Sequence, residues 1–408
     1  MRVPAEVLEV AGRFAVAGRP VACVPWGGGH INDTYAVTCN EDGRETRYLL
    51  QRINTAVFRN PLQVTENIAR VTEHIAGRLR AAGVYDIERR VLQLVLTAEP
   101  NADRREAATR AADPPEDASG REPTPADATG RQSHSVDATG RQPAYIDAAG
   151  RYWRMYRFIE RTRISAAVTS PAEAFAAGEA YGTFQRLLID LPGPRLHETI
   201  PGFHDTPARY AALDAAIAAD ACGRVAEAQP EIDFAQRRRD LAGALLDLHN
   251  RGLLPERVVH NDAKMDNVLL DATTGTGQCV VDLDTVMPGL APFDFGDMVR
   301  TMTTFAAEDE QDLRRVVVQM PLFTALARGY LESAGPFLLP AERDHLVTAG
   351  KLITLEQGVR FLTDYLRGDT YYKTTRPGQN LDRTRAQFAL VGSIETVEQK
   401  MNAVVART

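Results

Sequence analysis

The chain carries the sequence VVHNDAKMDNVLLDATTGTGQCVVDLD at residues 258–284. Within it, two short runs of β-type residues, 268–270 and 279–281, flank a turn rich in threonine and glycine, so they predict an antiparallel hairpin. Asn267 comes immediately before the first run, and Asp282 comes immediately after the second. Because the runs are antiparallel, both polar side chains are expected at the same end of the hairpin.

The first half of this stretch has the spacing H-x-D-x-x-x-x-N, which is typical of a kinase catalytic loop. In such a loop the carboxylate, here Asp262, accepts the proton of the attacking hydroxyl group. Lys264 would offset the charge that develops on the transferred phosphoryl group. An amide oxygen of Asn267 and a carboxylate of Asp282 would form a hard-oxygen site suited to Mg²⁺. A polar turn that contains these residues by chance is the alternative, and the strand context favours the kinase interpretation.

A D-F-G sequence begins at Asp294, and its letters are those of a metal-binding motif in protein kinases. We do not assign Asp294 as a metal ligand, because it opens an apolar helical run, where Asp is commonly a cap. We expect Asp294 and Asp297 to brace the catalytic loop or the helix end, with capping alone as the alternative. Asp284 is a candidate for a supporting role or for a second metal ion.

Three consecutive glycines, Gly27, Gly28 and Gly29, precede a predicted strand near the N-terminus. Backbone amides there would approach phosphates without a clash from a Cβ atom. This position favours a nucleotide lid, and a plain flexible turn is the alternative. His30 and Asn32 follow as polar candidates for the substrate site.

The distribution of patterns predicts an α+β protein with two lobes, like that of a protein kinase. A small β-rich N-terminal lobe is expected at 1–160, and a larger, mostly helical catalytic lobe at 161–408. Ligands usually bind in clefts between lobes. Phe158 and Glu160 fall in the predicted hinge, where backbone groups would bind adenine.

A ten-residue repeat interrupts the N-terminal lobe at about 101–146. Units such as D-A-T-G-R contain few large apolar side chains, so they cannot stack as a solenoid and predict a disordered surface loop. The last copy, from Asp147, sits between two strand-like segments and supplies turn residues. We interpret the insertion as a hairpin turn lengthened by copies of itself, which costs entropy only logarithmically.

The composition narrows the possible partners. The 408 residues include 47 basic and 54 acidic side chains, which give a net charge of -7. The protein therefore lacks the positive field that binding to nucleic acid or to an anionic membrane requires. No apolar stretch approaches the ~18 residues of a membrane span, and no signal peptide is evident. Four separated cysteines suggest neither a zinc site nor disulfides. We expect a monomeric cytoplasmic protein that acts on a small molecule.

The layout, with H-N-D-x-K-x-x-N and V-V-D-L-D, resembles the aminoglycoside phosphotransferase and choline kinase group of small-molecule kinases. Within that group, further strings are similar to the bacterial N-acetylhexosamine 1-kinases, and the likeness covers nearly the whole chain apart from the repeat. These strings are GGGHINDTY (27–35), QPEIDF (229–234), DLDTVMPG (282–289), FDFGD (293–297) and GVRFLTDYLRGDTYY (358–372).

The resemblance implies ATP- and Mg²⁺-dependent phosphorylation of the anomeric hydroxyl of N-acetylglucosamine or N-acetylgalactosamine. It makes the first lobe nucleotide-binding and the second catalytic and sugar-binding, with His30, Arg360 and Tyr371 holding the sugar. The alternative for Arg360 is a salt bridge to Glu356, and Tyr371 could simply pack. Another small-molecule kinase acting on an aminoglycoside, choline or a different sugar remains open, as does a non-catalytic nucleotide-binding regulator.

One position departs from the family pattern. The strand that in most relatives carries a phosphate-binding lysine has Gln51 at that place, followed by Arg52. Either Arg52 or Lys264 would then provide the positive charge, or nucleotide binding would rely more on magnesium and backbone amides.

Overall fold

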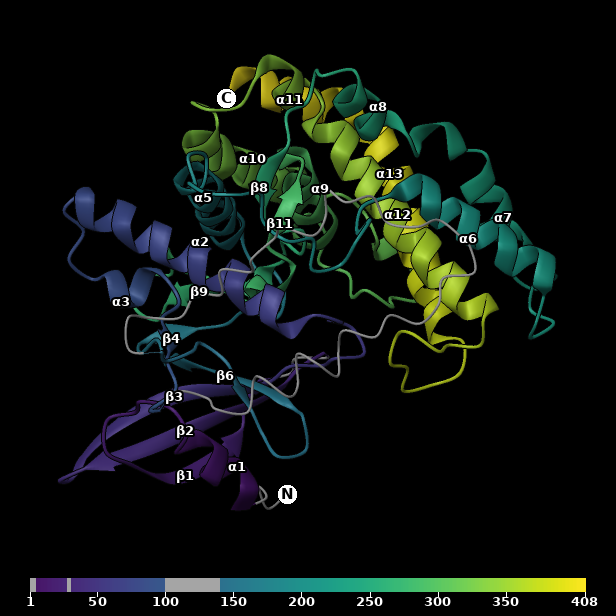
Figure 1. Ribbon diagram of the computed structural model, residues 1–408. Coiled ribbons are helices and arrows are strands. Elements are labelled where there is room, and N and C mark those ends of the chain that lie inside the picture. Colours follow the sequence, from purple (N-terminus) through teal and green to yellow (C-terminus); the bar gives the residue numbers. More distant parts are fainter. Residues whose placement is uncertain (1–4, 28–30, 100–139) are drawn as a thin grey trace, which may run out of the picture. The chain divides into compact units, whose positions relative to one another are not determined.

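An antiparallel sheet followed by a mostly helical part confirms the fold class predicted from the sequence (Figure 1). The structure is a computed structural model that describes residues 5–27, 31–99 and 140–408. Gly28, Gly29, His30 and most of the predicted repeat at 101–146 lie outside the described residues. The chain groups into two units, Met1–Glu73 with Leu92–Ile159 and His74–Val91 with Glu160–Thr408.

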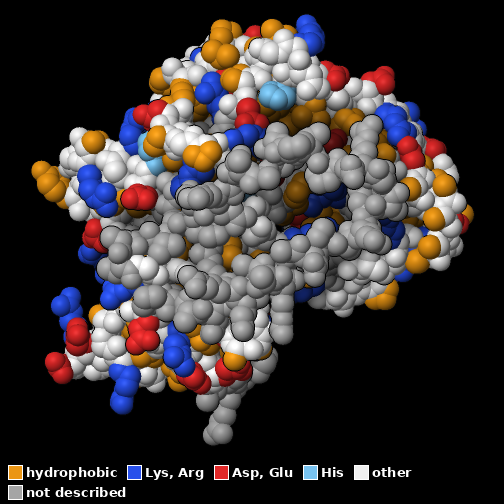
Figure 2. Space-filling view, in the orientation of Figure 1, with side chains coloured by type: hydrophobic (Ala, Val, Ile, Leu, Met, Phe, Trp, Pro, Cys, Tyr) orange, Lys and Arg blue, Asp and Glu red, His pale blue; other side chains and the backbone are white. Residues whose placement is uncertain are grey.

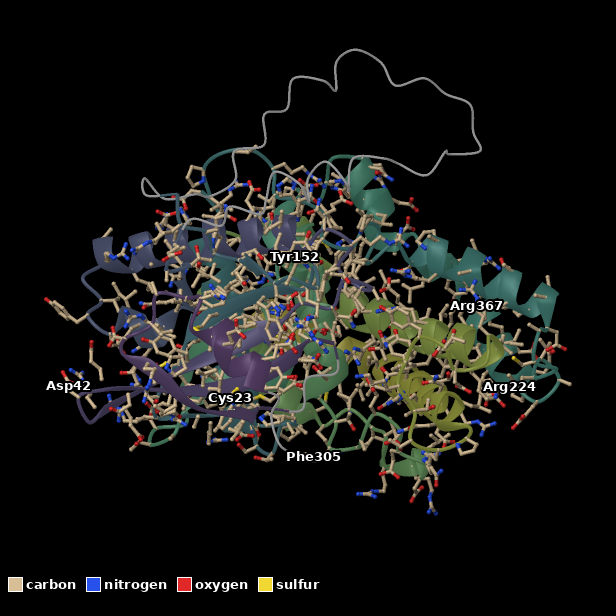
Figure 3. All side chains as sticks on the ribbon, turned by 60° about the horizontal axis from the view of Figure 1, so that its bottom comes forward. Cys23, Asp42, Tyr152, Arg224, Phe305 and Arg367 are labelled. Carbon is tan, nitrogen blue, oxygen red and sulfur yellow. The ribbon has the colours of Figure 1, made fainter. Side chains whose placement is uncertain are left out.

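The first unit is built on a sheet with the strand order β1-β2-β3-β6-β4, and β5 pairs with β6. A two-residue turn, Asp42-Gly43, joins β2 to β3 with φ of 51° and 86°, as hairpins with left-handed turn residues require. Asp42 marks the tip of that hairpin in Figure 3. The elements are α1 (Ala5–Ala11), β1 (Arg19–Pro25), β2 (Asp33–Glu41), β3 (Arg44–Arg52), β4 (Leu94–Val95), β5 (Tyr145–Ile146) and β6 (Tyr152–Arg157). Helix α2 (Pro61–Ala81) begins in the first unit, and its residues from His74 onward belong to the second.

One face of this sheet forms the core of the first unit. Tyr48 and Leu50 of β3 alternate with half-buried residues and pack with Trp153 and Met155 of β6. The last repeat copy forms the β5–β6 turn, where the Asp147 carboxylate accepts hydrogen bonds from the backbone N–H groups of residues 149 and 151 at 2.9 and 3.0 Å. As predicted, the strand before the insertion pairs directly with the strand after it, because β4 and β6 are antiparallel neighbours.

The second unit is mostly helical, with two small sheets of order β10-β9-β7 and β11-β8. Acidic and basic side chains are interspersed over the helices on the face seen in Figure 2. No helix in the described ranges is both long enough and apolar enough to cross a membrane. The elements are α3 (Ile87–Arg90), β7 (Thr162–Arg163), α5 (Pro171–Leu187), α6 (Thr206–Ala219), α7 (Gln229–Gln236), α8 (Ala244–Asn250), β8 (Arg257–Val259), β9 (Val268–Asp271), β10 (Gly277–Val280), β11 (Met287–Gly289), α9 (Ala291–Met302), α10 (Met320–Ala334), α11 (Pro340–Asp344), α12 (Leu346–Leu366) and α13 (Gln379–Arg407).

Helix α9 packs closely against α12 at positions occupied by glycine. A Cβ atom added at Gly296 of α9 would lie 2.6 Å from the carbonyl oxygen of Ala349, and one at Gly350 of α12 would lie 2.8 Å from Val299. Only glycine permits this close approach of the two backbones. The two helices therefore present their polar side chains from a rigid, closely packed pair.

Candidate active site

The hairpin predicted from the sequence is present in the second unit. β9 and β10 pair antiparallel with Val268 opposite Val280, and the backbone N–H of Val281 donates to the carbonyl oxygen of Asn267 at 2.9 Å. Asn267 is buried in a short 3₁₀ turn, Met265–Asn267, that leads into β9. Asp282 directly follows Val281 and has a left-handed φ of 58°. The two candidate metal-binding residues thus leave the same end of the hairpin.

Asp262 is tied to both neighbouring candidates. The Asn267 side-chain amide donates to the Asp262 carboxylate at 3.1 Å and to its backbone carbonyl at 2.9 Å, while Lys264 Nζ lies 3.3 Å from the same carboxylate. Burial alone would raise the pKa of Asp262, but the positive charges of Lys264, His260 and Arg300 outweigh it and lower the pKa. Asp262 is therefore ionised at neutral pH, as a general base must be.

Asp282 has the opposite electrostatic character. Desolvation, together with the negative charges of Asp284 and Asp262, raises its pKa to about 6, although solvent reaches its side chain. Repulsion from the negative charges of Asp284 and Asp262 raises the pKa of Asp282 even where water reaches its carboxylate. Asp262 and Asp282 are therefore close enough for their charges to interact. A divalent cation would relieve the repulsion between them.

The donor set fits Mg²⁺. Both amide hydrogen bonds of Asn267 use its nitrogen, which leaves the amide oxygen as the atom that can bind a cation. Within residues 5–27, 31–99 and 140–408, no three His, Cys, Asp or Glu side chains gather closely enough to hold a metal ion by themselves. Magnesium commonly needs only one or two protein oxygens and completes its shell with phosphates and water. Asn267 and Asp282 meet that requirement.

Lys264 is held between two carboxylates. Its Nζ lies 3.3 Å from Asp262 and 3.8 Å from Asp266, and the charge of Asp262 is the main cause of its raised pKa. Lys264 therefore carries its proton throughout the physiological range. The hydroxyl of Tyr181 on α5 donates to the Lys264 backbone carbonyl at 2.9 Å and fixes this part of the loop.

Asp294, the first residue of the D-F-G sequence, binds the catalytic loop. It is fully buried, and its two carboxylate oxygens accept hydrogen bonds from the backbone N–H groups of His260 at 2.9 Å and Asn261 at 2.7 Å. The Gln185 amide donates to it at 2.7 Å. Helix α9 begins after Leu290, so Asp294 is not the residue at its cap position.

Asn261 is where the loop is most constrained. It has φ of 64°, a conformation that few residues other than glycine adopt. Besides the Asp294 contact, its side-chain amide donates to the Thr285 carbonyl at 3.0 Å, and its own carbonyl lies 3.2 Å from His204 Nε2. Together these contacts hold the backbone immediately before Asp262 in a single conformation.

Two residues of this network, His204 and Arg300, were not found by sequence reasoning. The buried His204 ring connects the Asn261 carbonyl to Glu356 of α12. Its Nδ1 lies 2.9 Å from the Glu356 carboxylate. Arg300 donates to Asp297 at 2.7 Å and is close enough to Asp262 to lower its pKa. The i, i+3 spacing of Asp297 and Arg300 was a usable helical signal, whereas nothing in the local sequence identifies His204.

Asp284 stands next to the site but not in the loop. Its side chain is buried, and its backbone carbonyl accepts a hydrogen bond from the Thr199 hydroxyl at 2.7 Å. Its negative charge raises the pKa of Asp282. Its supporting role therefore stays a prediction with an electrostatic basis.

Arg360 and Tyr371 lie on and just beyond α12. The Arg360 guanidinium is positioned over the rings of Phe203, at 5.2 Å, and Tyr372, at 5.7 Å, and donates to Gln357 at 3.0 Å. Glu356, the alternative partner considered for Arg360, instead accepts hydrogen bonds from His204 and Thr206. Tyr371 is 61% exposed, so it does not simply pack in the interior.

The segment that carries Tyr371 is held by one carboxylate. Asp364 accepts hydrogen bonds from the consecutive backbone N–H groups of residues 370, 371 and 372 at 2.8–3.0 Å. Asn380 of α13 donates to the same carboxylate at 2.9 Å. This arrangement fixes the exposed Tyr371 ring beside Tyr372, with ring centroids 4.8 Å apart.

The candidates in the first unit lie at the ends of its strands. Gly27 has φ of 74°, and a Cβ atom there would meet nothing within 4 Å. The Asn32 side chain accepts a hydrogen bond from the backbone N–H of Asn54 at 2.9 Å, so it pins this loop to the end of β3. Arg52 forms an exposed ion pair with Asp33, with Nε and Oδ2 2.8 Å apart.

The two candidate hinge residues flank the division between the units, which falls between Ile159 and Glu160. Within the first unit, the Phe158 ring lies under the Arg47 guanidinium at 4.0 Å and meets the Trp26 ring edge-on at 5.2 Å. The adenine-binding role of Phe158 and Glu160 stays a prediction.

Comparison with known proteins identifies the family. Residues 22–329 match the model of the phosphotransferase enzyme family. The structure is similar to choline kinase from Cryptosporidium parvum Iowa II, at 10% identity over 97% of each chain with a TM-score of 0.52. It is also similar to a spectinomycin phosphotransferase solved with ADP and spectinomycin, at 12% identity over 96% of this chain and 98% of that one, with a TM-score of 0.49. A Plasmodium vivax ethanolamine kinase matches at 12% identity over 90% of this chain and 82% of that one, with a TM-score of 0.47.

At these identities the structural likeness shows the fold alone. The family model, in contrast, matches more than half of the chain and includes the whole loop and hairpin described above. The chain therefore belongs to the phosphotransferase enzyme family.

Proposed function

We propose that this phosphotransferase transfers the γ-phosphoryl group of ATP to the anomeric hydroxyl of an N-acetylhexosamine, N-acetylglucosamine or N-acetylgalactosamine, and releases the sugar 1-phosphate. The sequence strings similar to N-acetylhexosamine 1-kinases support this acceptor. The observation that carries the proposal is the setting of Arg360. Its guanidinium lies over the Phe203 ring at 5.2 Å and the Tyr372 ring at 5.7 Å, and its charge interacts with Arg300, which in turn interacts with Asp262.

The charges around Arg360 favour a neutral acceptor. Arg300 lies close enough to Arg360 for the two positive charges to interact, and the nearby Glu356 is already bound by His204 and Thr206. A cationic acceptor such as choline or an aminoglycoside would need an acidic or aromatic cage free of positive charge. A sugar instead needs directional N–H donors for its oxygens and a ring face for its apolar side. Arg360, Tyr371 and Tyr372 supply these groups.

In the proposed reaction, Asp262 accepts the proton of the anomeric hydroxyl as its oxygen attacks the γ-phosphorus. The new O–P bond forms while the bond to the bridging β,γ-oxygen breaks, and ADP leaves with that electron pair. Asn267 holds the Asp262 carboxylate in place by its amide hydrogen bond of 3.1 Å. Protonated Lys264 offsets charge on the transferred group. Mg²⁺, held by Asn267 and Asp282, would neutralise charge on the phosphates when it is bound.

The test is a substrate panel. The protein is mixed with ATP, Mg²⁺ and N-acetylglucosamine, N-acetylgalactosamine, galactose, choline or an aminoglycoside, and phosphorus and proton NMR identify the product. We expect phosphate on O1 of an N-acetylhexosamine. Product from choline or the aminoglycoside alone, or phosphate on another oxygen, would reject the proposed acceptor.

Two variants separate turnover from binding. Asp262→Asn is expected to lower turnover by about 10²- to 10⁴-fold with the fold intact. Asp266→Asn removes a neighbouring carboxylate that is not proposed to take the proton and serves as the matched control. If no panel member is phosphorylated while ATP still binds, the N-acetylhexosamine acceptor is rejected.

A further inference from the structure

A glutamine on α12 sets the direction of the hydrogen bonds around Arg360. The Arg360 guanidinium donates from Nη1 to the Gln357 amide oxygen at 3.0 Å, and the Gln357 amide nitrogen donates to the Tyr372 hydroxyl oxygen at 3.2 Å. A guanidinium has donors and no acceptor, so the amide oxygen of Gln357 must face Arg360 and its nitrogen must face Tyr372. The Tyr372 oxygen therefore accepts a hydrogen bond, and its own O–H hydrogen is directed elsewhere.

Arg360, Gln357 and Tyr372 together present donors to a ligand. Within the described part of the chain, the Tyr372 hydroxyl bonds only to Gln357, and Arg360 donates only to that same residue. The Tyr372 O–H group and the remaining N–H groups of the guanidinium are thus left for another acceptor. The acceptor atoms of the cluster, the Gln357 amide oxygen and the Tyr372 oxygen, are each engaged. The Glu356 carboxylate next to Gln357 is bound by His204 and Thr206 instead.

The Tyr372 side chain is held in one position. Its backbone N–H donates to the Asp364 carboxylate at 3.0 Å, and its ring packs edge-on against buried Phe361 with the ring centroids 4.6 Å apart. The side chain is half-buried. A hydroxyl group fixed at the backbone, at the ring and at its own oxygen donates in one direction, which selective recognition of a single ligand atom requires.

One segment connects this cluster to the catalytic loop. The Phe203 ring lies under the Arg360 guanidinium at 5.2 Å, and the next residue, His204, has its Nε2 3.2 Å from the carbonyl oxygen of Asn261. The proposed base, Asp262, directly follows Asn261. The donors around Arg360 and the proposed base therefore belong to one connected part of the second unit.

A group that accepts hydrogen bonds and donates none matches these donors best. A sugar hydroxyl carries a hydrogen that itself needs an acceptor, whereas a carbonyl oxygen has two lone pairs and no hydrogen. The one carbonyl oxygen of an N-acetylhexosamine is in its acetamido group. We infer that Tyr372 recognises this group, with its O–H donating to the carbonyl oxygen and an Arg360 N–H as the second donor. The inference deepens the proposed function and rests on the N-acetylhexosamine acceptor proposed above.

The first test compares an N-acetyl sugar with its parent hexose, N-acetylglucosamine with glucose or N-acetylgalactosamine with galactose, on the full chain and on Tyr372→Phe. This change keeps the ring and removes only the hydroxyl. We expect the KM of the N-acetyl sugar to rise about 5- to 50-fold. The kcat and the KM of ATP should change by less than twofold, because the acetamido group does not react. The parent hexose, measured as a substrate or as a competitive inhibitor, should be affected by less than twofold.

Gln357→Glu tests the direction of the hydrogen bond. The new carboxylate accepts hydrogen bonds from both Arg360 and Tyr372, so the Tyr372 hydrogen turns toward it and away from the ligand. Tyr372→Phe added to this variant should then raise the KM of the N-acetyl sugar by less than a further twofold, although the same change in the full chain raises it about 5- to 50-fold. Independent effects of the two changes would overturn the inference.

Tyr365→Phe is the matched control, because it removes a hydroxyl of the same helix that donates to Glu227 at 2.8 Å and should leave the KM of the N-acetyl sugar unchanged. An unchanged KM of the N-acetyl sugar in Tyr372→Phe, or an equal loss for the parent hexose, would overturn the inference. A rise in the KM of ATP instead would also overturn it, since it would assign these donors to a phosphate. If the full chain phosphorylates no N-acetylhexosamine, the proposed function fails before any variant is compared, and the inference falls with it.

Discussion

Replacing Asp294 by asparagine tests whether the D-F-G aspartate braces the loop or binds metal. The carboxylate accepts hydrogen bonds from the backbone N–H groups of His260 and Asn261 and from the Gln185 amide, and all of these groups are buried. An asparagine offers one acceptor oxygen and turns an amide nitrogen toward another donor. At least one buried N–H loses its partner, and the charge-assisted character of the others is lost. We expect a loss of about 2 to 4 kcal/mol in the free energy of unfolding.

The effect of Asp294→Asn on the catalytic loop gives a second way to tell bracing from metal binding. Without its anchor, Asn261 can leave its left-handed conformation and displace Asp262, so kcat should fall while the Mg²⁺ concentration for half-maximal activity changes little. Urea unfolding, kcat and a Mg²⁺ titration are measured on Asp294→Asn and on Asp312→Asn, a surface control whose carboxylate binds Arg314. A large rise in the Mg²⁺ requirement with unchanged stability would show that Asp294 is a metal ligand and refute the bracing argument.

Three further predictions concern packing and charge. Gly296→Ala places a Cβ atom 2.6 Å from a carbonyl oxygen of α12 and should lower the free energy of unfolding in urea by about 1 to 3 kcal/mol. Gly392→Ala is the control: a Cβ atom there meets nothing within 4 Å, so this change should be neutral or stabilising. His204→Ala leaves Thr206 as the remaining hydrogen-bond partner of the buried Glu356 carboxylate and should cost about 1 to 3 kcal/mol, with a smaller cost when Glu356→Gln is added; equal costs would show that His204 and Glu356 do not interact. Asp282 has a folded-state pKa of about 6, above its unfolded value, so its contribution to stability falls as pH rises between about 4 and 6. Asp282→Asn should therefore be more stable than the native chain at pH 7, by less than about 1 kcal/mol because solvent reaches the group, and the two should converge near pH 4; lower stability at neutral pH would contradict this.

The parts of the site that could be predicted are local in sequence. Asn267 and Asp282 flank two strands joined by a short turn, so alternation and turn chemistry place both at one end of the hairpin, and the structure has that pairing. The spacing of Asp262 and Asn267 is likewise short enough for one loop to bring them into contact. In such cases covalent connectivity leaves few arrangements, and the pattern of residue types selects among them.

The residues that were missed depend on contacts between distant elements. Arg154 of β6 donates two hydrogen bonds to the Gln51 amide oxygen, but the two residues are separated by about a hundred positions, including the repeat insertion, and only the β3–β6 register brings them together. His204 sits in a segment without a motif and reaches the catalytic loop only because α12 places Glu356 beside it. In its local sequence, each of these two residues looks like an ordinary strand or turn residue. The role of each depends on the distant residue that it contacts. Such partners matter most for Asn261, whose left-handed backbone is unfavourable by itself and is kept by Asp294, Thr285 and His204 together. The strain beside the proposed base is thus maintained by the tertiary fold, which is why a motif search finds Asp262 but not the residues that hold it in position.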